Sequence, residues 1–125
     1  HFKRFGVAGV RHFLMTTQEF VQTPTYQELG EVGIVFIDGF HSEEQAHFDF
    51  AAFERLVPAH GVILLHDSIR IRTSGIYGSD RVYEHRVRCL IDQLRGRAGL
   101  QLFDLPFGDG LTLVRRVGDP ETLHE

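Results

Sequence analysis

Two apolar runs with one amphipathic segment between them, all within residues 34–68, limit the fold of this chain more than any other feature. Ile34–Ile37 and Val62–Leu65 are continuous runs of β-favouring apolar residues. Runs of this kind predict strands that are covered on both faces, as in a parallel sheet. Between them, Ser42 is a good helix N-cap, and Gln45 three positions later completes a capping box.

The segment after Ser42 has the apolar spacing of a helix. Its stripe consists of Ala46, Phe50, Phe53 and Val57, and Pro58 and Gly61 end it. A strand, a helix and a second strand make the right-handed crossover unit of doubly wound sheets. We therefore predict an α/β fold, Rossmann-like and doubly wound, with a mostly parallel sheet.

The residues after this unit predict a different ending for the sheet. Ile69–Gly78 has no clear periodicity and predicts a loop. Ser79 can cap a further helix, whose apolar stripe would be Tyr83, Val87, Leu90 and Leu94. Leu100–Leu105 and Leu111–Arg115 flank the turn-rich sequence PFGDG, which predicts an antiparallel hairpin at the end of the sheet.

The residues before the unit are less regular. Val10–Thr16 fits a short strand, preceded by the tail of a helix over Phe2–Gly9. Thr23–Thr25 predicts a turn or a helix start, and Tyr26–Leu29 one helical turn. The residues 119–125 resemble a frayed tail.

Length and composition set the broad class. A chain of 125 residues forms one domain, residues 1–125, and a net charge of −4 argues against nucleic-acid binding. The single cysteine, Cys89, excludes an internal disulfide and fits a cytoplasmic protein. No apolar run has the roughly 18 residues of a membrane span. The chain begins with His1 and its only methionine is Met15, so we expect a piece of a longer protein.

Polar side chains follow both predicted parallel strands. Asp38, Gly39 and His41 come after the first strand, and His66 and Asp67 end the second. Ligands of open α/β sheets bind outside the carboxyl ends of the strands, so these groups are the candidates for acid–base chemistry. His41, Asp67 and His66 are the candidate catalytic residues.

Each of these residues also has a purely structural interpretation. Asp38 could shape a turn, and Asp67 could cap the following loop. His41 could bond only to the backbone before the helix, and His66 could point into the sheet as a buried structural residue. His85, among other histidines, belongs to no usable pattern.

A metal site is a further expectation. Asp38 and Asp67 offer the hard oxygen ligands that suit Mg²⁺. Adding His41 would favour a softer ion such as Mn²⁺, Fe²⁺ or Zn²⁺. No spacing in the sequence is diagnostic of a metal, and a glycine-rich phosphate loop is absent from the sequence.

The sequences VFIDGFHSEEQ and LVPAHGVILLHDS resemble the fourth and fifth strand regions of class I S-adenosylmethionine-dependent methyltransferases, in the group with an IDGxH…HD pattern. Asp38, Gly39, His41 and the pair His66-Asp67 match that pattern. Phe40 stands where the family often has an acidic residue, and the family's first strand and glycine-rich cofactor loop are missing. The resemblance implies that the chain is the carboxyl-terminal part of such a domain.

The resemblance also implies a function. It suggests methyl transfer to an oxygen, or less often a nitrogen, of a small molecule or sugar. S-adenosylmethionine would be the cofactor, with Thr17, Gln18, Asp38 and Gly39 as candidate contacts. Two alternatives remain open at this point: a non-catalytic half-Rossmann binding module, and a metal-dependent hydrolase. We expect no membrane partner, and either an oligomer or a missing amino-terminal half.

Overall fold

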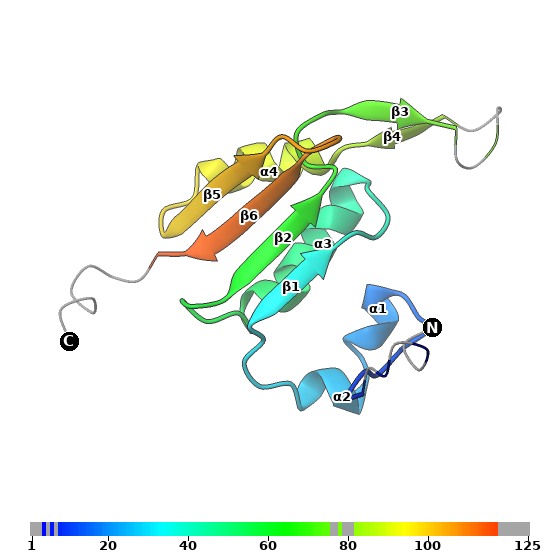
Figure 1. Cartoon of the computed structure of the whole chain (residues 1–125), viewed down its shortest axis with the longest axis vertical. Helices are drawn as coiled ribbons and strands as arrows, with labels where there is room; N and C mark the ends of the chain where they lie inside the picture. The colour runs from blue at the N-terminus through cyan, green and yellow to red at the C-terminus, as the bar shows by residue number, and fades with distance from the viewer. Residues whose placement is uncertain (1–3, 5, 7, 76–77, 79–81, 118–125) are drawn as a thin grey trace.

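The computed structural model describes residues 4, 6, 8–75, 78 and 82–117, and its centre is a four-stranded sheet (Figure 1). The strands, in the order β1-β2-β6-β5, are β1 (Ile34–Ile37), β2 (Val62–His66), β6 (Leu111–Arg116) and β5 (Leu100–Leu105). β1 and β2 are parallel, whereas β6 is antiparallel to both of its neighbours. The predicted α/β fold class is confirmed, including the parallel pair and the terminal hairpin.

Helices α3 (Glu43–Glu54) and α4 (Val87–Arg95) pack behind this sheet (Figure 1). Between the helices and the sheet lies the hydrophobic core, which includes Ile37, Phe50, Leu65, Leu90 and Val114. Ser42 caps α3 as predicted, because its hydroxyl accepts a hydrogen bond from the Gln45 amide. The Gln45 side chain does not close a capping box. It donates instead to Asp49, 2.7 Å away.

The second face of the sheet differs from the prediction. The expectation that β1 is covered on both faces is wrong for the described residues, since Ile34 and Phe36 are 68 % and 55 % exposed. No helix among the described residues lies over this face. On this face, one row of paired residues crosses all four strands. It consists of Phe36, Leu64, Leu113 and Phe103.

The amino-terminal residues pack beside α3. The helices α1 (Thr17–Phe20) and α2 (Pro24–Gln27) are each one turn, and Thr23 caps α2 as a helix start. Rings of Phe20 and Tyr26 contact Phe53 of α3. Residues 10–16 form no strand, so that prediction is wrong. A strand exists only through pairing, and no described segment pairs with these residues.

A second, two-stranded sheet replaces part of the predicted loop and helix. β3 (Arg72–Ser74) pairs antiparallel with β4 (Tyr83–His85), beyond the carboxyl ends of β1 and β2 (Figure 1). Tyr83 therefore belongs to a strand, and the helix begins only at Val87. The other members of the predicted stripe are buried along α4, as expected.

Some expectations fall outside the described residues. These are the proposed cap at Ser79, half of the expected helix tail over residues 2–9, and the tail 119–125. Within the described parts of the chain, none of the helices has the length and apolar character needed to cross a membrane.

Candidate functional site

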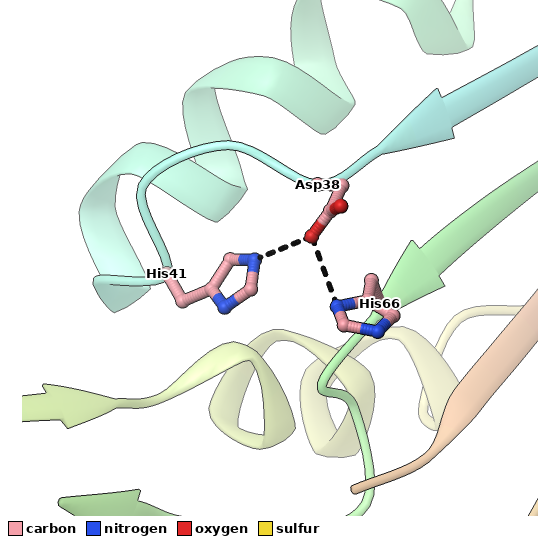
Figure 2. A group of neighbouring side chains, drawn as sticks. All are labelled: Asp38, His41 and His66. Carbon is pink, nitrogen blue, oxygen red and sulfur yellow. Dashed lines mark ion pairs between the residues drawn. The ribbon is translucent and has the colours of Figure 1, made fainter. Parts of the chain in front are cut away.

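Asp38 and His66 meet where the two parallel strands end. Asp38 follows β1 directly, and its Oδ1 atom lies 2.9 Å from Nδ1 of His66, the last residue of β2. The same oxygen lies 3.3 Å from Nε2 of His41, which precedes α3 (Figure 2). These three side chains therefore meet at one edge of the sheet, as the rule for ligand sites at strand ends predicted.

Asp67 approaches His41 from the other side. Its Oδ2 atom lies 2.8 Å from His41 Nδ1, so His41 is held between two carboxylates. Asp67 has a left-handed backbone with φ of 52°, a conformation that aspartate tolerates better than most residues. This turn at the end of β2 directs the Asp67 side chain inward, where it is only 3 % exposed.

Exposure divides the predicted residues into two kinds. The structural interpretation of His66 as a buried residue is wrong, because its side chain is 44 % exposed. His66 shares a strand face with Leu64 and contacts the ring of Phe36, on the face that no described helix covers. His41, in contrast, is only 7 % exposed and lies beneath the surface of the site.

The β3–β4 sheet adds two residues that the sequence did not single out. His85 of β4 is 4 % exposed, and its Nδ1 atom lies 2.8 Å from His41 Nδ1 and 3.3 Å from Asp67 Oδ2. Arg72 of β3 donates to Asp67 Oδ2 over 3.0 Å and also pairs with Asp109. No local sequence signal marks these residues, because strand pairing alone brings them to the site.

Burial lowers the pKa of His85 below its ordinary value of 6.5, and electrostatic interactions with Arg72 and His41 lower it further. The carboxylates of Asp67 and Asp109 act in the opposite direction and only offset part of this effect. His85 is therefore neutral at pH 7, with a lone pair on one ring nitrogen.

The candidate cofactor residues line two neighbouring hollows beside β1. One, of about 370 Å³, is bounded by Thr17, Asp38 and Gly39 together with apolar side chains that include Phe36 and Phe53. The other, of about 230 Å³, is bounded by Thr17, Gln18 and Gly39. All four residues suggested by the family resemblance thus face the same side of the site.

The candidate metal ligands fall into two groups that share His41. Asp38 groups with His41 and His66, and Asp67 groups with His41 and His85, with the ligand atoms of each group within 4.8 Å of one another. Asp38 and Asp67 therefore belong to two different clusters, each of which contains His41. Their predicted role as a common metal pair stays a prediction.

A family model described as a methyltransferase domain matches residues 2–68, which include both strand ends of the site. Comparison with curated proteins finds no significant match.

Solved structures share the fold at low identity. A protein from Corynebacterium glutamicum superposes with a TM-score of 0.65 and 20% identity, over 94% of this chain and 53% of that one. The SAH-bound methyltransferase PaMTH1 of Podospora anserina gives 0.54 and 20%, over 94% and 53%. A methyltransferase from Geobacter sulfurreducens gives 0.52 and 14%, over 75% and 40%. The chain thus spans about half the length of the structures it matches, or less.

Proposed function

Because the chain belongs to a methyltransferase domain family, whose model matches residues 2–68, we propose that it forms part of the active site of an S-adenosylmethionine-dependent methyltransferase. The acceptor we propose is an oxygen, or less often a nitrogen, of a small molecule or sugar. The observation behind this proposal is the linked series of carboxylates and imidazoles at the ends of β1 and β2.

The cofactor side of the proposed site is the pair of hollows beside β1. Their walls combine apolar rings with the polar groups of Thr17, Gln18 and Asp38, as in pockets that hold a nucleoside. S-adenosylmethionine, when bound, supplies a methyl group on a positively charged sulfonium. The half-exposed Asp38 carboxylate contributes negative charge at the edge of the hollow where a cation would lie.

The acceptor side is formed by the histidines. Among the three candidate catalytic residues, only His66 is exposed enough to contact an acceptor directly. Asp38, 2.9 Å from His66 Nδ1, orients the ring so that Nε2 can accept the proton of an acceptor hydroxyl. His41 and Asp67 lie behind this pair, and we assign them as positioning residues that hold Asp38 in place.

Mg²⁺ fits this site poorly. Asp38 faces two imidazoles, and Asp67 Oδ2 is already in contact with His41, His85 and Arg72. Magnesium prefers oxygen ligands and water in nearly ideal octahedral geometry, which two carboxylates turned toward imidazoles do not supply. We therefore assign no step of the proposed reaction to magnesium.

The cofactor assignment is tested by titrating S-adenosylhomocysteine into the full-length protein in a calorimeter. We expect binding at one site. Titrated in the same way, S-adenosylmethionine carries the sulfonium charge, so we expect Asp38→Ala to weaken it by at least about tenfold and to weaken the uncharged S-adenosylhomocysteine less. Asp92→Ala, which removes an exposed acid from α4, is the matched control and should leave the affinity unchanged.

An absence of heat with S-adenosylhomocysteine would contradict the proposal. Turnover of ester substrates by the same protein, with a tightly bound divalent ion, would then support the hydrolase alternative. Equal weakening by Asp38→Ala and Asp92→Ala would remove Asp38 from the cofactor site.

A further inference from the structure

Three ligand atoms from three separate segments converge beneath the surface of the site. They are Nδ1 of His41, Nδ1 of His85 and Oδ2 of Asp67, and their separations are 2.8, 2.8 and 3.3 Å. The three residues are only 7, 4 and 3 % exposed. We propose that they bind one divalent transition-metal ion, which fastens the β3–β4 sheet onto the ends of β1 and β2.

The dimensions of this triangle match a metal ion. Nitrogen and oxygen ligands lie about 2.0–2.2 Å from such ions, so they are separated by about 3.0 Å at the right angles of an octahedral site and by about 3.4 Å in a tetrahedral zinc site. The observed separations of 2.8, 2.8 and 3.3 Å are closer to the octahedral spacing. A single ion above the triangle would therefore contact all three atoms with little movement of the side chains.

The tautomers also suit metal binding. When an ion occupies the triangle, Nδ1 of His41 would bind it, and Nε2, which lies 3.3 Å from Asp38 Oδ1, would carry the proton. A carboxylate behind a ligating histidine is the usual outer-shell arrangement at metal sites.

The carboxylates around the cluster outnumber the guanidinium. Asp38, Asp67 and Asp109 bring three carboxylates to the cluster, and Arg72 is the guanidinium that contacts two of them. Two imidazoles and one carboxylate form a donor set for borderline ions such as Zn²⁺, Mn²⁺ or Fe²⁺, in place of Mg²⁺. This inference concerns metal binding alone and does not depend on the proposed methyl transfer.

The test is a titration of Zn²⁺, and separately Mn²⁺, into the metal-free full-length protein. We expect one equivalent to bind. His85→Gln should raise the Kd more than about 100-fold, because even outer-shell partners are worth roughly 10- to 100-fold. His66→Gln should raise the Kd less, because His66 Nδ1 lies 3.5 Å from Asp67 Oδ1 and is not one of the three proposed ligands. His60→Gln, an exposed histidine in the turn before β2, should leave the Kd within about twofold.

Two results would overturn the proposal. One is a wild-type protein that binds neither ion, in which case hydrogen bonds alone connect the three side chains. The other is a loss of binding in His66→Gln as large as that in His85→Gln, which would move the ion to the neighbouring cluster.

A measurement on the unaltered protein covers the case in which His85 variants do not fold. In the Co²⁺-loaded protein, both ligating rings carry their exchangeable proton on a buried Nε2. We expect two strongly shifted, solvent-sheltered imidazole N–H resonances in the proton NMR spectrum. A spectrum without them would contradict ligation by His41 and His85.

Discussion

Nδ1 of His66 lies 2.9 Å from Oδ1 of Asp38, so the ends of the two parallel strands are linked through their side chains. Both side chains are nearly half exposed, at 44 % and 47 %. Solvent weakens ion pairs of this exposure, and such a pair adds about 0–1 kcal/mol to stability. We therefore infer that the main effect of the Asp38–His66 pair is to orient the imidazole ring of His66.

A double-mutant cycle on this pair tests that interpretation. Loss of a general base costs about 10²–10⁴-fold in rate, so we expect a fall of this size in kcat for His66→Gln. Asp38→Asn should lower kcat less, and the double variant should be no slower than His66→Gln alone. The measurement is transfer of a labelled methyl group to a panel of phenol and sugar acceptors.

The control for this cycle is His60→Gln, an exposed histidine in the turn before β2, which should keep wild-type kcat. Full turnover in His66→Gln would show that His66 is not the proton acceptor.

The buried His85 predicts a specific pH dependence of stability in metal-free protein. Because burial, Arg72 and His41 lower its folded pKa below 6.5, both states are neutral above that pH and His85 adds no slope. Below pH 6.5, His85 binds a proton in the unfolded chain but not in the folded protein. The free energy of unfolding should then fall by up to about 1.4 kcal/mol per pH unit, until the pH reaches the folded pKa.

Urea unfolding at pH 7.5, 6.5 and 5.5 in the presence of a chelator measures this slope. His85→Gln should show a shallower decrease than wild type, whereas His60→Gln should follow wild type. Parallel curves for wild type and His85→Gln would mean that His85 is not the group responsible.

Gly110 positions the end of β2, and its replacement should be costly. Its φ is 103°, and a Cβ atom there would lie 2.4 Å from Cγ1 of Ile69. The carbonyl of Gly110 also accepts a hydrogen bond from the amide of Ser68, next to Asp67. Overpacking together with backbone strain predicts that Gly110→Ala lowers the free energy of unfolding by about 2–4 kcal/mol.

Urea unfolding checks this value, with Gly30→Ala as the control because nothing lies within 4 Å of a Cβ at that position. Adding Ile69→Ala to Gly110→Ala should recover only part of the overpacking loss, because the Cβ atom of residue 69, 2.6 Å away, remains. A loss in Gly110→Ala no larger than in Gly30→Ala would contradict the clash.

Local patterns in the sequence were enough to predict β1, α3, β2 and the β5–β6 hairpin. Apolar runs, the Ser42 cap and the PFGDG turn act over a few residues, so they determine structure without knowledge of the rest of the fold. The rule that ligands bind at strand ends then predicted the meeting of Asp38, His41 and His66.

Non-local pairing explains what the sequence did not predict. Tyr83 lies four residues before Val87, a spacing that fits a helix, but pairing with Ser74 makes it part of a strand. That pairing also carries His85 into the site. The exposure of His66 was missed for a related reason, because nothing in β2 itself shows which face of the sheet lacks a cover among the described residues.

The uncovered face of the sheet leads to the last prediction. Phe36 and Phe103 lie at opposite ends of one row across the four strands, and they are 55 % and 51 % exposed. Ile34 and Leu105 are also exposed on these two edge strands, and apolar side chains exposed together across a sheet face usually mark an interface. We therefore expect the 125-residue chain to associate with itself through this face.

Sedimentation velocity across a range of protein concentrations measures this association. Phe36→Lys with Phe103→Lys should shift the chain toward monomer, because each charge would have to be buried without a partner. Phe48→Lys, on α3 at the helix side of the sheet, offers a matched exposed phenylalanine and should leave the association unchanged. A wild-type chain that stays monomeric and unfolds cooperatively would show that this face is stable in water, and the surface would then need no partner.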